Sequence, residues 1–190
     1  MKTIKLIIKF IFLIFFAAIS ASAFVAACIY SPWTPTNKKD LKRLKKILNV
    51  NKNDIVYDLG CGDGRLCVYL AKNTNAKKII GIELSFIYYL IAKCKVYFYH
   101  LNDRVQIQWG DVFHKNLHEA SKIFFYFTPK TAEKLKTKLY QELSRGVKVA
   151  SYVYPINGWM HDSVDQENEK QRPIYIYTMN EQMHSVIFDH

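Results

Sequence analysis

The chain has 190 residues, of which half are hydrophobic and 15% aromatic, so it has enough apolar residues for one domain plus a short appendage and is not a disordered chain. Its net charge is +11, and three of its 27 basic residues precede position 30, which leaves 24 basic against 16 acidic residues in the rest. Such an excess suits nucleic acid, an acidic protein or an anionic membrane surface, and it is equally consistent with ordinary solubilising charge. The four cysteines form no C-x-x-C pair, so we expect free thiols rather than a disulfide framework or a zinc site.

The segment from Phe10 to Tyr30 contains 21 residues without a charge. At about 1.5 Å per residue, a helix of this length spans roughly 30 Å, the thickness of a bilayer's hydrocarbon core. Three lysines precede the segment and six basic residues follow it between positions 38 and 46, so the positive-inside rule places the rest of the chain in the cytoplasm. We therefore expect residues 1–30 to form one transmembrane anchor and residues 31–190 to form a folded domain.

Other interpretations of this segment remain open. Ala21-Ser22-Ala23 resembles a signal-peptidase site, and Val25-Ala26-Ala27-Cys28 resembles a bacterial lipobox that would leave Cys28 lipidated. Both would export the rest of the chain. A buried helix of a soluble protein is a further alternative.

Strand and helix patterns alternate over the rest of the chain. A proline-containing segment, residues 31–36, interrupts any helix, and Asn37 can cap a helix over residues 38–48. Apolar patterns predict strands over 54–59, 78–82, 105–109, 122–127, 147–153 and 173–179, and helices over 64–72, 86–101 and 131–143. This order is typical of a mostly parallel sheet covered by helices on both faces, with the late strand added antiparallel at one edge.

The most informative motif is Asp58-Leu-Gly60-Cys-Gly62-Asp63-Gly64-Arg65, between the first strand and the helix that follows. In open α/β sheets, ligands bind beyond the carboxyl ends of the strands. Counted from Gly60, the last glycine of the dinucleotide fingerprint G-x-G-x-x-G is replaced by Arg65, and no G-K-[ST] is present, so neither a dinucleotide site nor a Walker loop fits. The acidic start of the loop favours a cationic ligand, such as the ammonium and sulfonium of S-adenosylmethionine (SAM).

Two further acids end the next strands. Glu83 is placed to accept hydrogen bonds from both ribose hydroxyls, and Asp111 from an adenine amino group, although a capping or surface role is the alternative for either. Three acids at successive strand ends favour one shared site. The residues that we expect to contact the cofactor are Thr36, Asp58, Gly60, Cys61, Gly62, Asp63, Glu83, Asp111 and Val112, with Thr36 at its carboxylate.

With these motifs the chain resembles class I SAM-dependent methyltransferases, and more narrowly the group that contains archaeal protein-lysine methyltransferases and the membrane-anchored lysine methyltransferase of the ATP synthase c subunit. The resemblance covers residues 33–179 and includes Trp33-Thr-Pro-Thr36, Gly81-Ile-Glu83 and Gly158-Trp159 beside the glycine-rich loop. It implies an N-terminal transmembrane helix followed by a Rossmann-like, seven-stranded, mostly parallel α/β sheet. It also implies methyl transfer from SAM to a protein lysine. SAM is scarce outside the cytoplasm, which favours the uncleaved anchor.

The substrate side carries weaker motifs. Trp33, Tyr126 and Trp159 are candidates for an aromatic wall around the lysine stem, with simple packing as the alternative. The chain departs from the family pattern at Trp33, where Tyr is common, and at Asn37, where a second Pro is common. The identity of the substrate is therefore less secure than that of the cofactor.

Several other functions are not indicated. His114 and His118 have a metal-like spacing, but the sequence offers no evident third ligand and methyl transfer needs no metal, so we expect none. No [N/D]-P-P-[Y/F] motif follows the fourth strand, so nucleic acid is not the expected partner. We expect a protein substrate, with membrane proteins among the candidates. A small-molecule methyltransferase and a non-catalytic SAM-binding or exported lipoprotein module remain the alternatives.

Overall fold

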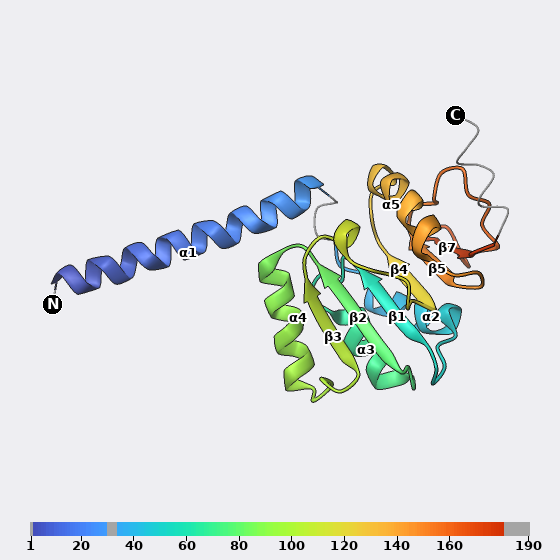
Figure 1. The fold of residues 1–190 in the computed structure, drawn as a ribbon, viewed down its shortest axis with the longest axis horizontal. Helices are drawn as coiled ribbons and strands as arrows, with labels where there is room; N and C mark the ends of the chain where they lie inside the picture. The colour runs from blue at the N-terminus through green and yellow to red at the C-terminus, as the bar shows by residue number, and fades with distance from the viewer. Residues whose placement is uncertain (1, 30–33, 181–190) are drawn as a thin grey trace.

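The computed structural model describes residues 2–29 and 34–180 (Figure 1). Trp33, a predicted substrate-side residue, lies outside this part of the chain. A long helix precedes an α/β domain. The elements in chain order are α1 (Lys2–Ile29), α2 (Lys38–Leu48), β1 (Ile55–Leu59), α3 (Arg65–Asn73), β2 (Lys78–Glu83), α4 (Phe86–Phe98), β3 (Val105–Trp109), the 3-10 turn η1 (Val112–His114), β4 (Lys122–Phe125), α5 (Pro129–Glu142), β5 (Lys148–Tyr152), β6 (Ser163–Asp165) and β7 (Ile174–Thr178).

The strands form one seven-stranded sheet in the order β3-β2-β1-β4-β5-β7-β6. The first five strands in this order are mutually parallel, and β7 is antiparallel to both of its neighbours. The predicted Rossmann-like, mostly parallel sheet is thus confirmed. The predicted edge position of the late strand is wrong, because β6 pairs with the outer side of β7. The sequence gives little indication of β6, since it has three residues with no buried side chain.

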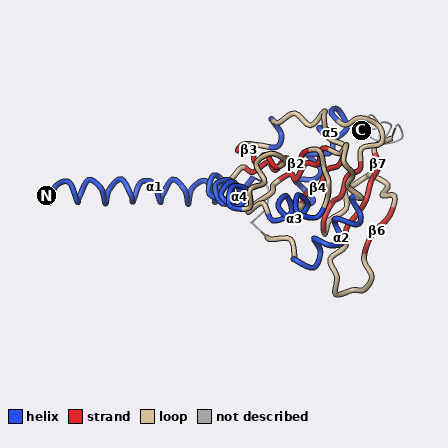
Figure 2. The backbone as a smooth tube through the Cα atoms, turned by 90° about the horizontal axis from the view of Figure 1, so that it is seen from below, coloured by secondary structure: helices blue, strands red, loops and turns tan. Residues whose placement is uncertain are grey.

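Alternating side chains of the sheet build two cores. On one face, Val56, Ile79 and Phe124 pack with α2, α3 and α4. On the other face, Leu59 and Ile123 pack with α5 and with the segment around η1. Figure 2 shows the layers edge-on. Helices therefore cover both faces, as predicted, with three on one side and one helix plus η1 on the other.

Local sequence accounts for several element ends. The Asn37 side chain accepts a hydrogen bond from Lys39 N at 3.1 Å, which confirms the predicted cap of α2. Thr128 caps α5, which starts at Pro129 rather than at residue 131 because proline is favoured in a first helical turn. The helix α4 ends at Phe98, three residues earlier than predicted, since His100 takes the left-handed conformation with φ 54°.

The helix α1 projects away from the domain in both views (Figures 1 and 2). Its stretch Thr3–Ser22, 20 residues long, is apolar and long enough to cross a membrane. An apolar helix near an N-terminus is also typical of a signal sequence. The Ser22 hydroxyl accepts a hydrogen bond from Phe86 N at 3.0 Å, which joins α1 to the start of α4.

Candidate active site

The glycine-rich turn after β1 contains three residues with left-handed backbone. Gly60, Gly62 and Gly64 have φ values of 75°, 54° and 72°, which glycine adopts without steric cost. The Gly60 and Cys61 amides both donate to the Ile82 carbonyl, at 2.9 and 3.0 Å, so the loop is fastened to the end of β2. A Cβ on Gly64 would lie 2.9 Å from the Ala92 Cβ, so α4 can approach the loop only because this residue is glycine.

Glu83 holds two segments of the site together. Its Oε2 accepts from Gly62 N at 2.8 Å and its Oε1 from Ser85 N at 2.7 Å. Burial raises the pKa of this carboxyl, although the backbone N–H donors act in the opposite direction. A carboxylate has about four lone-pair sites. Glu83 therefore retains capacity to accept from a diol while it shapes the loop.

Asp58 is an almost fully buried carboxyl at the end of β1, with 3% of its surface exposed. Its pKa is raised to about 7. Burial is the main cause, the negative charges of Glu83 and Asp63 act in the same direction, and the Cys67 thiol, which donates to Oδ2 at 3.5 Å, acts to lower it. Within the described part of the chain, no Lys or Arg forms an ion pair with Asp58. A cationic ligand would compensate the negative charge of the buried carboxylate, so the environment of Asp58 fits a sulfonium or an ammonium group.

Asp63 differs from Asp58 because it is already neutralised. Arg65 Nε lies 2.8 Å from Oδ1 and Lys95 Nζ lies 2.5 Å from Oδ2. Burial acts to raise the pKa of Asp63, but the two cations outweigh it and the pKa is lowered. Asp63 thus ties the loop to α3 and α4, and a direct contact with a cofactor stays a prediction.

The third acid, Asp111, follows β3. Its Oδ1 accepts from Phe113 N at 2.7 Å, so it caps η1 as the capping alternative anticipated. Its other oxygen lies 3.5 Å from His114 Nδ1. Gly110 N donates to the Glu83 carbonyl at 2.9 Å, which brings this turn to the end of β2. Asp58, Glu83 and Asp111 therefore lie at the carboxyl ends of three neighbouring strands, while Val112 beside them is core.

The remaining predicted residues lie at different distances from this centre. Thr36 is buried, and its carbonyl accepts from Arg65 Nη1 at 3.2 Å, so the segment before α2 lies beside the loop. Tyr126 packs edge-on against Tyr152 with ring centroids 4.9 Å apart, on the α2 side of the sheet. Trp159 belongs to the core on the α5 side. The structure does not bring Tyr126 and Trp159 together into one aromatic wall.

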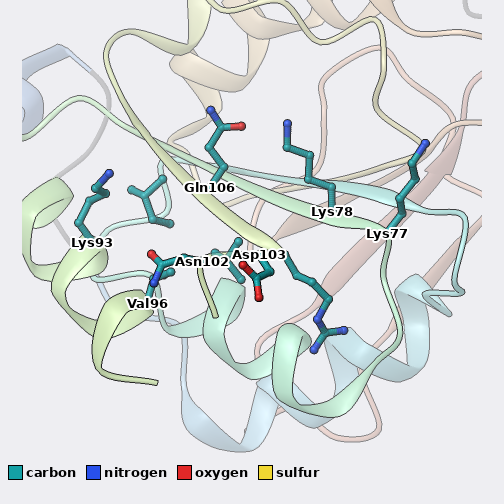
Figure 3. Close-up of a pocket in the computed structure, with 10 residues that line it drawn as sticks. Lys77, Lys78, Lys93, Val96, Asn102, Asp103 and Gln106 are labelled. Atoms are coloured by element: carbon teal, nitrogen blue, oxygen red, sulfur yellow. The ribbon is translucent and has the colours of Figure 1, made fainter. Parts of the chain in front are cut away.

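The part of the chain that the structure describes also has a cavity of about 360 Å³, at the amino ends of β2 and β3 (Figure 3). It lies at the opposite end of these strands from Glu83 and Asp111. This cavity is therefore separate from the candidate site.

Comparison with known proteins identifies the chain's family. Residues 58–163, which include the loop and all three acids, match the ANTKMT methyltransferase domain. The chain belongs to this family. A protein-lysine N-methyltransferase of Saccharolobus islandicus (strain REY15A) is 33% identical to it over 152 residues, which cover 79% of this chain and 94% of the relative.

Other proteins that are similar to this chain are also methyltransferases. The lysine N-methyltransferase of the ATP synthase c subunit from Xenopus laevis is 22% identical over 147 residues, which cover 76% of this chain and 64% of the relative. The crystal structure of an RNA methyltransferase from Salinibacter ruber, in complex with S-adenosyl-L-homocysteine, superposes with a TM-score of 0.74 at 28% identity, covering 78% of this chain and 95% of that one. The predicted resemblance to class I methyltransferases is confirmed.

The sequence did not single out three residues that shape this member of the ANTKMT family. Cys67 reaches Asp58 from the first turn of α3, Lys95 reaches Asp63 from α4, and Ser85 binds Glu83 through its amide. The thiols of Cys67 and Cys61 both lie over Gly81, where an added Cβ would meet them at 2.9 and 2.8 Å. No sequence motif marks these residues, because packing of α3 and α4 on the sheet brings them to the loop.

Proposed function

We propose that the protein is a membrane-anchored methyltransferase that transfers a methyl group from SAM to a lysine side chain of a protein. One observation carries the proposal: Asp58, Glu83 and Asp111 surround the glycine-rich loop at three adjacent strand ends, in a chain of the ANTKMT methyltransferase domain family. The similarity to a protein-lysine N-methyltransferase over nearly all of that relative's length favours lysine as the acceptor.

SAM supplies a methyl group activated by a positively charged sulfur. In this chain, Asp58 compensates the positive charge, Glu83 accepts from the ribose hydroxyls and Asp111 accepts from the adenine amino group. Gly60, Gly62 and Gly64 let the backbone approach without a Cβ. The other proposed cofactor contacts are Thr36, Cys61, Asp63 and Val112, of which Asp63 acts by holding the loop and Val112 by forming its apolar floor.

The acceptor lysine has to be neutral to react. Lowering its pKa from about 10.4 to about 7 costs roughly 4–5 kcal/mol. Desolvation at the site lowers this pKa, so a general base is not required. Tyr126 is half-buried and directly follows β4, which pairs with β1. It is proposed to contact the lysine stem, and Trp33 is proposed to do so from the segment before Thr36. Trp159 is proposed to set the shape of the site from within the core.

The proposed domain organisation is an anchor over residues 1–30 and a catalytic domain over residues 31–190 on the cytoplasmic side. The apolar stretch Thr3–Ser22 of α1 and the excess of basic residues after it support this arrangement. A membrane protein is the substrate that such an anchored enzyme meets most often.

Transfer of labelled methyl groups tests the function. The full-length protein is incubated with methyl-labelled SAM and with separated membrane and soluble fractions of cells that lack it, and labelled products are identified by mass spectrometry. We expect methyl-lysine in membrane proteins, and Glu83→Gln is expected to abolish the labelling. Label confined to lipids or metabolites would overturn the lysine proposal, and label in soluble proteins alone would overturn the membrane substrate.

RNA methylation is a second candidate. The net charge of +11 and the similarity to the Salinibacter ruber RNA methyltransferase favour it. Total RNA added to the same reaction distinguishes the two: ribonuclease-sensitive label would support RNA, and protease-sensitive label would support a protein.

A further inference from the structure

The outer face of α4 is apolar along its whole length. Among the residues of α4, Ala92 and Val96 are the buried ones. At 3.6 residues per turn, the side of the helix opposite to them carries no charged residue. We call this set the α4 stripe: Ile87, Leu90, Ile91, Cys94, Tyr97 and Phe98. Tyr97 and Phe98 are 67% and 74% exposed, and Ile91 is 37% exposed. Cys94 is also exposed, whereas Ile87 and Leu90, nearer the start of the helix, are partly buried. Exposed apolar side chains that gather on one face in this way mark a contact surface.

Positive charge borders the α4 stripe. Lys93 projects about a quarter turn to one side of its centre, whereas Lys95, on the other side, is paired with Asp63. Lys93 also lines the cavity at the amino ends of β2 and β3, together with the basic residues Lys77, Lys78 and Arg104 (Figure 3). A helix with an apolar face and basic flanks is typical of helices that lie in the interface plane of a membrane, where lysines reach anionic headgroups.

The position of α1 connects this stripe to the proposed anchor. The stretch of α1 long enough to span a bilayer ends at Ser22, and Ser22 binds the first residue of α4. Figures 1 and 2 show α1 leaving the domain on the side that α4 forms, and α4 running across the direction of α1. If α1 follows the membrane normal, α4 therefore lies in the membrane plane.

We propose that the α4 stripe is a membrane-contact surface that lies in the interface of the same bilayer that α1 crosses, with Lys93 and the basic cavity facing anionic lipid headgroups. This inference rests on the proposed function, of which the α1 anchor is a part. The continuity of the α4 stripe with α1 and the exposed Lys93 on its flank favour a lipid surface as the occupant over a second copy of the chain. Trp109 is also exposed, and its ring centroid lies 5.3 Å from that of Phe86 at the start of α4, so it is proposed to lie at the same depth in the membrane interface. The contact fixes the orientation of the active-site edge relative to the membrane.

Cys94 provides a probe in the middle of the stripe, since it is exposed whereas Cys61 and Cys67 are buried. The full-length protein with Cys28→Ser is labelled at Cys94 with a fluorophore and reconstituted into vesicles of phosphatidylcholine and phosphatidylglycerol with brominated acyl chains. Two matched proteins in the Cys94→Ser background carry the same label elsewhere. Phe12→Cys reports on α1, and Lys134→Cys reports on the exposed surface of α5.

The proposal predicts strong quenching by bromine at Cys94 and at Phe12→Cys and none at Lys134→Cys, because interfacial helices bury their apolar face by about 5–10 Å. Quenching at Phe12→Cys with Cys94 no more quenched than Lys134→Cys would overturn the α4 contact and leave the anchor intact. Quenching at Cys94 without Phe12→Cys would support the contact and overturn the anchor, and quenching at neither would overturn both.

The lipid charge and the alternative occupant are tested with the same labelled protein. Vesicles of phosphatidylcholine alone, or the substitution Lys93→Glu, are expected to reduce quenching at Cys94, and unchanged quenching in both would overturn the role of anionic headgroups. A Cys94 label that becomes shielded from water in lipid-free detergent as protein concentration rises would assign the stripe to a second copy and overturn the membrane contact.

Discussion

At the scale of single residues, Asp58 combines a structural cost with a proposed binding role. Its pKa of about 7 lies above the ordinary value because burial disfavours the charged form. An acid whose pKa is raised by folding destabilises the folded state as pH rises from about 4 to about 7, and the full cost persists above 7. A bound cation offsets this cost, which links the affinity for SAM to the ionisation of Asp58.

The substitution Asp58→Asn tests this link. Without ligand, we expect the variant to be more stable than the wild type at pH 8, by up to about 4 kcal/mol at 1.36 kcal/mol per pKa unit, and to show little difference at pH 4. SAM affinity of the wild type is expected to fall as pH decreases below 7, and the variant is expected to bind weakly at every pH. Thermal unfolding and titration calorimetry measure these effects. Equal SAM affinity of the two proteins at pH 8 would contradict the role of Asp58.

Gly64 tests the close approach of α4 to the loop. A side chain at Gly64 is disfavoured by its φ of 72° and by the Ala92 Cβ at 2.9 Å. Gly146 is a matched control, since its φ is 86° and no atom lies within 4 Å of an added Cβ. Each Gly→Ala change is expected to cost about 1–3 kcal/mol from backbone strain, with Gly64→Ala costing more and also weakening SAM binding. Equal urea-unfolding losses and equal SAM affinity would show that the approach of α4 does not matter.

At the scale of elements, the sequence predicted all but one of the strands in the described residues, because buried parallel strands are continuous apolar runs bounded by turn residues. The glycine-rich loop and the three acids at strand ends also followed from the sequence, since carboxyl ends of parallel strands share one edge. The partners of Asp58 and of the loop residue Asp63 did not, because Cys67 and Lys95 reach them only through tertiary packing. The apolar pattern of α4 does not show which of its side chains face the sheet; in the structure, Ala92 and Val96 are the buried ones.

The attachment of α2 to the sheet is a further contact without a sequence motif. The Tyr152 hydroxyl, on β5, donates to Asp40 Oδ2 at 2.5 Å, and Arg43 Nη1 donates to the other oxygen at 2.8 Å. Arg43 also pairs with Asp165 of β6. Burial and the neighbouring carboxylate raise the pKa of Tyr152, so it remains a donor at physiological pH. This network holds the segment that carries Thr36 against the domain.

We expect Tyr152→Phe to lower the free energy of unfolding by about 1–3 kcal/mol, because it leaves a buried carboxylate with one donor fewer. Urea denaturation measures the loss. Tyr97→Phe, at a side chain that is 67% exposed, is the matched control and is expected to change nothing. If both variants unfold at the wild-type urea concentration, the hydrogen bond to Asp40 contributes no net stability.

At the scale of the whole molecule, the sheet order places the ends of β1, β2 and β3 together, and α1 joins the domain near the end of β2 through Phe86. The catalytic edge and the proposed anchor are therefore neighbours (Figure 1). The sequence predicted an anchor and a catalytic domain as separate segments. Their relative placement depends on contacts between residues about 60 positions apart, such as Ser22 and Phe86, and no local pattern indicates these.

A calorimetric titration of SAM into the full-length wild type, Glu83→Gln and Glu133→Gln tests the proposed cofactor site directly. Glu133 is an exposed carboxylate on α5 and serves as the control. We expect saturable binding to the wild type, unchanged binding to Glu133→Gln, and affinity at least about tenfold weaker for Glu83→Gln, a difference of about 1.4 kcal/mol. No binding to the wild type, or equal affinity for Glu83→Gln, would contradict a SAM site at the ends of these strands.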